Sequence, residues 1–127
     1  MDVTKQKYKV VIVRNDMDGK ELRRETQYFE SILNAFIYFK ARKEHEMLIL
    51  SEELSMTIRQ IEKEAIQDLV YFTYSNAIGC TIALCFKDKD FPLKDEQFEE
   101  LYAYETEHYQ GRVYWPGYEG GNNNENL

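Results

Sequence analysis

The spacing of apolar residues changes twice along this chain of 127 residues. Residues 8–14 are rich in β-branched side chains, which favour strands. Over residues 32–69 the apolar positions instead recur every three or four residues, as on one face of a helix. Strand-type residues return over 70–74 and 80–86. Because strands come first, helices follow and strands return, the pattern predicts an α+β fold in one domain.

Both groups of strands are predicted to form hairpins. An Asp-Gly pair at residues 18–19 is a strong signal for a tight turn after the first strand. Residues 22–29 then alternate in character, as in a strand with one side in water. In the second hairpin, strands 70–74 and 80–86 are joined by a turn. We expect the two hairpins to combine into one mostly antiparallel sheet.

Two helices are predicted between the hairpins. Ser31 is placed to cap the first helix, whose apolar stripe covers residues 32–39. The charged residues 40–46 are expected to be its solvated end. Residues 47–50 fit either a short strand or a connection between helices. A narrow apolar stripe over residues 54–69 predicts the second helix.

A third helix is predicted near the C-terminal end. Pro92 suits its first turn, and the helix runs to about His108. The predicted order is therefore ββ-αα-ββ-α, with a mostly antiparallel sheet of two hairpins covered by about three helices. This single α+β domain is assigned to residues 1–110. Residues 111–127 are assigned to a tail that is first aromatic and then rich in glycine and asparagine.

The net charge of −7 is concentrated in one part of the sequence. The first 87 residues contain 13 basic and 13 acidic side chains, whereas residues 88–127 contain 3 basic and 10 acidic ones. Eight of the 18 aromatic residues also lie in those last 40 residues. An uneven charge of this kind is informative about binding partners, although acidity also serves solubility alone.

The third helix concentrates this acidity on one face. At 100° per residue, Phe98, Leu101 and Tyr102 share one side and are expected to pack on the sheet. Four glutamates share the opposite side, where neighbours three or four residues apart repel each other. A partner with arginine or lysine side chains would relieve that repulsion. Tyrosine and tryptophan, the usual anchors of protein interfaces, follow in the sequence. The predicted partner-binding residues are Glu96, Glu99, Glu100, Tyr104, Glu107, Tyr109, Tyr114, Trp115 and Tyr118.

These features predict a small acidic protein that binds a basic surface on a partner protein. If that surface normally binds nucleic acid, the carboxylates take the positions of phosphates. Nuclease immunity proteins and phage-encoded inhibitors of defence enzymes share this size and charge, but no motif links the chain to them. Direct binding of nucleic acid or of anionic membranes is not expected, since both require clustered lysine and arginine. No apolar run is long enough for a membrane span, and a cytoplasmic location is expected.

Two alternatives come from other classes of protein. The first is a dimeric structural or chaperone-like adaptor, which would use an exposed sheet edge or an apolar helix, so a homodimer stays open. The second is an enzyme that combines carboxylates with His108, although no nucleophile signature accompanies that histidine. We expect no catalytic residue, and therefore a protein that is not an enzyme.

No cofactor or metal site is predicted. Cys80 and Cys85 are an odd number of positions apart, so a strand places them on opposite sheet faces as core residues. His45 is expected on the surface. The acidic residues of the first hairpin match part of a calcium loop, but Arg14 occupies the place of its first carboxylate. The glycines near the C-terminus lack the flanking strand and helix of a phosphate-binding loop.

Overall fold

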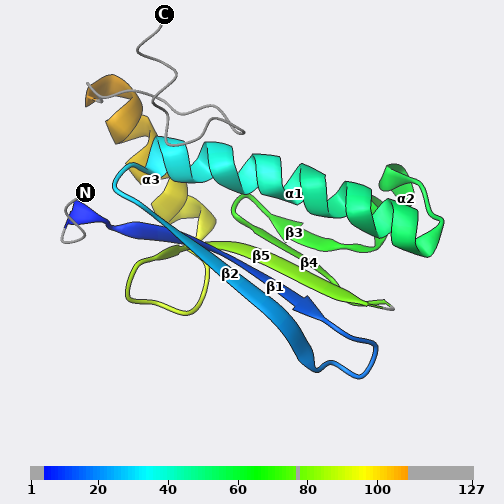
Figure 1. The fold of residues 1–127 in the computed structure, drawn as a ribbon. Coiled ribbons are helices and arrows are strands. Elements are labelled where there is room, and N and C mark those ends of the chain that lie inside the picture. The colour runs from blue at the N-terminus through cyan, green and yellow to red at the C-terminus, as the bar shows by residue number, and fades with distance from the viewer. Residues whose placement is uncertain (1–4, 77, 109–127) are drawn as a thin grey trace, which may run out of the picture.

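A computed structural model describes residues 5–76 and 78–108 (Figure 1). These residues form five strands and three helices in the order ββααβββα. Their bounds are β1 Tyr8–Asn15, β2 Glu21–Phe29, α1 Ile32–Leu54, α2 Ile58–Glu64, β3 Ile66–Asp68, β4 Tyr71–Tyr74, β5 Gly79–Phe86 and α3 Asp95–His108. The predicted single α+β domain with a mostly antiparallel sheet is confirmed.

The strands form one antiparallel sheet in the order β2-β1-β5-β4-β3. β1 lies between β2 and β5, with Ile12 paired to Glu25 on one side and to Ile82 on the other. The turn between β1 and β2 forms around Asp16, whose Oδ1 accepts hydrogen bonds from the backbone N–H of Asp18 and Lys20, both at 2.9 Å. The positive φ of 84° at Gly19 explains the glycine in this turn.

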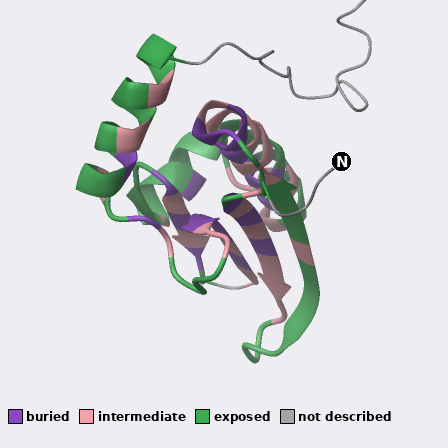
Figure 2. Ribbon diagram, turned by 90° about the vertical axis from the view of Figure 1, so that its left-hand side faces the viewer, coloured by how far each residue is buried: buried purple, intermediate pink, exposed green. Residues whose placement is uncertain are grey.

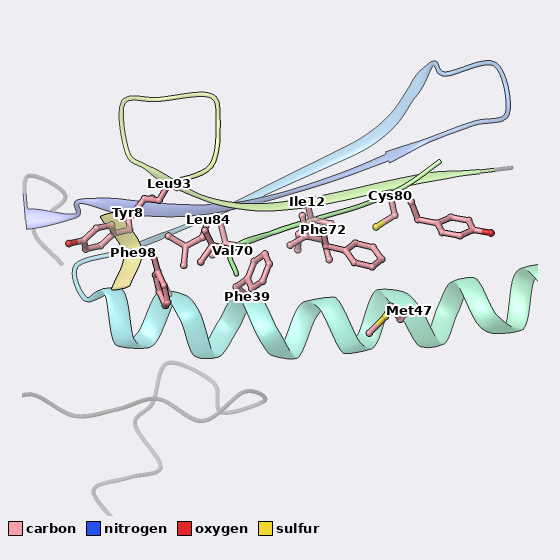
Figure 3. Packing of buried hydrophobic residues seen from close by; sticks show 14 of the residues in the cluster. Tyr8, Ile12, Phe39, Met47, Val70, Phe72, Cys80, Leu84, Leu93 and Phe98 are labelled. Carbon is pink, nitrogen blue, oxygen red and sulfur yellow. The ribbon is translucent and has the colours of Figure 1, made fainter. Parts of the chain in front are cut away.

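The core lies between one face of the sheet and α1 (Figure 1). Ile12, Phe72 and Leu84 point from β1, β4 and β5 toward the helix, and Phe39 of α1 meets them (Figure 3). All four side chains are completely buried. Because burial of one aliphatic side chain stabilises a fold by roughly 1.5–3 kcal/mol, this single layer is the main source of stability.

Helix α1 is longer than the sequence indicated. Instead of ending in a solvated segment, it continues to Leu54 and brings Met47 and Leu50 into the core. Its N-terminus is capped as predicted, since the Ser31 side chain accepts a hydrogen bond from the backbone N–H of Asn34 at 3.2 Å. The buried face of its second half also includes a charged residue, Glu46, which hid the continuation of the apolar stripe.

The predicted second helix is divided between a short helix and a strand. Thr57 and Gln60 form a capping box at the start of α2, and Ala65 ends it in an extended conformation. Residues 66–68 then pair with β4 as β3. The buried Val70 lies in the turn between these strands, and its carbonyl accepts a hydrogen bond from the backbone N–H of Leu84 at 3.0 Å. Sheet pairing has therefore overridden a weak helical pattern.

The two edges of the sheet differ in length. β3 offers three residues at one edge, whereas β2 offers nine at the other. β2 is exposed along most of its length, apart from partly buried Glu25 and Phe29 (Figure 2). Within the described part of the chain, β2 pairs only with β1.

Candidate functional site

Helix α3 begins where the loop after β5 returns to the sheet. Lys94 precedes the first turn, and its carbonyl accepts a hydrogen bond from the backbone N–H of Phe98 at 2.9 Å. The Gln97 side chain reaches back to the backbone N–H of Lys94 at 3.0 Å. Asp95 accepts a hydrogen bond from the backbone N–H of Leu69 at 3.3 Å. The hydrogen bond from Leu69 attaches the start of α3 to the turn between β3 and β4.

Aromatic rings attach the middle of α3 to α1. Phe98 is buried at the end of the core where α1 begins, close to the level of Tyr8 (Figure 3). Its ring centroid lies 4.6 Å from that of Phe36, and Tyr102 approaches the same Phe36 ring at 5.6 Å. The predicted inward face of the helix is thus correct, but its ring contacts are with α1 rather than with the sheet.

Glu105 attaches the last part of α3 to the N-terminus of α1. Its Oε1 accepts a hydrogen bond from the backbone N–H of Ile32 at 3.1 Å, and its Oε2 accepts one from Leu33 at 3.2 Å. The Ser31 hydroxyl also donates to Oε2. The first N–H groups of a helix have no partner within the helix, and its dipole favours a negative charge there. Glu105 therefore has a structural role, which the sequence pattern did not reveal.

The opposite side of α3 carries an acidic face, defined here as Glu96, Glu99, Glu100, Tyr104 and Glu107. All five side chains are exposed, Tyr104 with 64% of its surface. None of the ion pairs between described side chains involves these glutamates. Between Asp88 and His108 the sequence contains eight acidic residues and two basic ones. The negative charge of this face is thus presented to solvent without a counter-charge from the described part of α3.

Tyr104 and His108 extend the acidic face with aromatic surface. Their ring centroids are 4.1 Å apart and the rings are nearly parallel, at 18°. The Nδ1 atom of His108 lies 2.8 Å from the Tyr104 carbonyl oxygen. The imidazole is therefore held against its own helix. The remaining predicted partner-binding residues lie outside the described residues; they are Tyr109, Tyr114, Trp115 and Tyr118. The predicted domain boundary after residue 110 also lies outside them.

The other candidate groups are not assembled into a reactive centre. Cys80 and Cys85 are buried free thiols, and the pKa of each is raised to about 11, mainly because of this burial. The strand register places Cys80 beside Arg14 and Cys85 beside Lys9, on opposite faces of the sheet as predicted. No group of three or more His, Cys, Asp or Glu side chains within residues 5–76 and 78–108 is arranged to hold a metal ion.

A cluster of charges around one buried carboxylate joins α1 to the sheet and was missed in the sequence. Glu46 is completely buried; its Oε1 accepts from Arg14 Nη1 at 2.9 Å and its Oε2 from Arg42 Nη2 at 3.2 Å. Arg14 also holds Glu53 at 2.8 Å, and Arg42 holds Glu25 at 3.1 Å. The hydrogen bond from Arg42 is the main cause that lowers the pKa of Glu25.

The spacing of Arg42 and Glu46 was the available signal for that cluster. Residues four apart on a helix form ion pairs, but most such pairs lie in solvent. Nothing in the sequence showed that Arg14, which lies 32 residues before Glu46 on a strand, would approach the same carboxylate. Every charge in the cluster has a partner, so we assign it to stability rather than to binding.

Comparisons with known protein families, with curated proteins and with solved structures find no match to this chain. No helix in the described ranges is long and apolar enough to cross a membrane.

Proposed function

We propose that this protein is a small acidic binding module or inhibitor that docks the acidic face of α3 onto a basic surface of a partner protein. The observation that carries the proposal is the difference between the two sides of α3. Phe98 and Glu105 attach one side of the helix to the fold, while the glutamates of the other side have no ion pair in the described chain.

The geometry of a helix makes such a face a regular array of charge. Glu96, Glu100 and Glu107 lie near one line along the helix axis, on which each turn rises about 5.4 Å. An arginine or lysine surface on a partner would pair with several of these carboxylates at once. Since like charges three or four residues apart repel, binding would also remove a small internal penalty.

Charge and aromatic surface would contribute to different steps of binding. Long-range attraction between opposite charges speeds the encounter of two proteins, and buried aromatic anchors slow their separation. Tyr104 is the exposed aromatic residue on the described face. We propose Tyr109, Tyr114, Trp115 and Tyr118 as further anchors in the same interface.

A nucleic-acid-binding protein is the partner that this chemistry fits best. Such a protein carries clustered lysine and arginine side chains for phosphates, and the carboxylates of α3 would occupy the phosphate positions. Inhibition would follow because nucleic acid and the acidic face compete for one surface. The module itself would bind no nucleic acid, and a cytoplasmic location fits this role.

The test is capture of the partner with variants of equal charge. Three proteins are immobilised and exposed to a lysate of the producing cells. They are the wild type, the α3 variant Glu96→Gln/Glu99→Gln/Glu100→Gln, and the control variant Glu44→Gln/Glu52→Gln/Glu62→Gln. The control glutamates are also exposed and unpaired in the described chain, but they lie on α1 and α2. We expect wild type and control to retain the same basic protein at low salt, and the α3 variant to lose it.

Three results decide the matter. Loss of the partner from the α3 variant alone supports docking through α3. Equal loss from both variants would show that only total charge matters, and capture by all three would show that α3 is not the docking surface. Competition by DNA or RNA for the captured partner then tests the nucleic-acid-binding surface, and no competition would contradict it.

A further inference from the structure

The long edge of the sheet has features of a specific interface. β2 contains nine residues without proline or glycine, and within the described residues nothing pairs with its outer side (Figure 1). The unpaired N–H and C=O groups of such an edge are a template for another strand. The other edge, β3, has only three residues and offers much less.

The charges of β2 make it complementary to itself. Antiparallel pairing about a two-fold axis at Arg24 places Arg23 opposite Glu25 of the second copy, and this pair occurs twice. The same register places Leu22, which is 65% exposed, opposite Thr26 of the second copy. The edge carries two acidic and two basic residues, so its local charge is zero despite the net charge of the chain.

Neighbouring two-fold registers are less favourable. An axis at Arg23 places Glu21 opposite Glu25, and an axis at Glu25 places that glutamate opposite itself without forming any opposite-charge pair. Like charges directly opposite destabilise a pair of strands, whereas opposite charges stabilise it. In the register centred on Arg24 one like-charged pair remains, Arg24 with itself, but this guanidinium already holds Glu21 at 2.9 Å.

Glu25, the acceptor of the ion pair between the two copies, is already in position. Arg42 of α1 holds Glu25 at 3.1 Å, which keeps the carboxylate on the side of the sheet that α1 covers. Arg23 lies 3.1 Å from the same carboxylate, and 56% of its side chain is exposed. The Arg23 guanidinium therefore needs to turn only across the strand edge to reach Glu25 of a second copy.

We propose that β2 is a homodimer interface, in which two copies join their β2 edges antiparallel about Arg24 and form one continuous sheet. This interface involves only β2 and its contacts, so it is independent of the function proposed for α3. A dimer without partner capture would favour the structural adaptor, and partner capture by a monomer would leave the α3 proposal intact.

Cross-linking tests the register directly. Residues facing each other across the axis have Cα atoms about 4.5–5.5 Å apart, within the range of a disulfide. We therefore expect Arg24→Cys protein to form a covalent dimer under mild oxidation. Leu22→Cys and Thr26→Cys proteins should each stay uncross-linked alone and should cross-link to each other when mixed. The native cysteines are buried and form no background.

A charge reversal gives the second measurement. We expect wild-type protein to sediment as a dimer at micromolar concentration, and Arg23→Glu to raise the dimer Kd about tenfold or more, since two attractive pairs become repulsive. Arg59→Glu, an exposed arginine on α2, is the control with the same change of charge and should leave the Kd unchanged. A monomeric wild type, equal effects of both reversals, or efficient self-cross-linking of Leu22→Cys would each overturn the proposal.

Discussion

Glu46 shows how one residue determines the join between helix and sheet. Among the described residues, Glu46 is the one charged side chain that is completely buried. The guanidinium groups of Arg14 from β1 and Arg42 from α1 both pair with its carboxylate. A buried ion pair of this kind contributes little net stability compared with apolar residues of the same size. Removing one member is nevertheless costly, because the remaining charge stays buried without compensation.

We therefore predict that Glu46→Gln lowers the free energy of unfolding by about 3 kcal/mol. Glu53→Gln removes an exposed carboxylate from the same Arg14 and should cost less than about 1 kcal/mol. Urea denaturation followed by circular dichroism measures both values. Equal costs for the two variants would contradict a special role for burial.

The two thiols predict a loss of stability in alkali. Burial raises the pKa of Cys80 and Cys85 from 9.0 to about 11, so the folded protein keeps protons that the unfolded chain releases. Stability is thus complete below pH 9 and falls as the pH rises toward 11. Cys80→Ala/Cys85→Ala protein should show a shallower fall in urea denaturation between these pH values. A decline as steep as that of wild type would rule out the thiols as its cause.

At the scale of elements, α3 depends on one carboxylate for its attachment to α1. Replacement of a helix cap costs about 0.5–2 kcal/mol. Glu105→Ala should cost about 1–2 kcal/mol, toward the upper end of that range, because it removes hydrogen bonds to Ile32, Leu33 and Ser31 together.

Hydrogen exchange locates the effect of that substitution. We expect the amides of α3 and of the first turn of α1 to exchange faster in Glu105→Ala protein. Glu107→Ala, two residues further along on the exposed face, should change neither exchange nor stability by a measurable amount. Faster exchange throughout the sheet would instead indicate that Glu105 supports the whole fold.

The sequence predicts these elements unevenly, for physical reasons. The strands β1, β2, β4 and β5, the Ser31 cap and the two sides of α3 depend on local spacing, and the structure contains them. The boundaries of α1 and α2 depend on distant partners. Glu46 looked like a surface residue until two arginines met it, and residues 66–68 became a strand because β4 lay beside them.

In the candidate site, too, local spacing was predictable from the sequence and contacts with distant residues were not. The helical rotation of 100° per residue predicts that four glutamates share one exposed face of α3. The structure agrees, since all four are exposed: Glu96, Glu99, Glu100 and Glu107. That Glu105 turns inward also follows from its angle, but its role required the position of the α1 N-terminus. Such a contact, between residues 73 apart in sequence, leaves no local pattern.

At the scale of the whole molecule, stability and binding are assigned to different surfaces. We predict that Glu96→Gln/Glu99→Gln/Glu100→Gln changes the free energy of unfolding by less than about 0.5 kcal/mol, because relief of repulsion is offset by a weaker interaction of residue 96 with the helix dipole. Thermal denaturation checks this value. A loss of several kcal/mol would show that these glutamates maintain the fold, and loss of partner capture would then carry no information about docking.

The salt dependence of the association rate is the sharpest test of docking through the acidic face of α3. The captured partner is purified, and its association rate with wild-type protein and with Glu96→Gln/Glu99→Gln/Glu100→Gln protein is measured from low to high ionic strength. Electrostatic steering predicts a fast wild-type rate that falls steeply with salt, and a slower variant rate with a flatter dependence. Identical rates and identical salt dependence for the two proteins would contradict docking through the acidic face of α3.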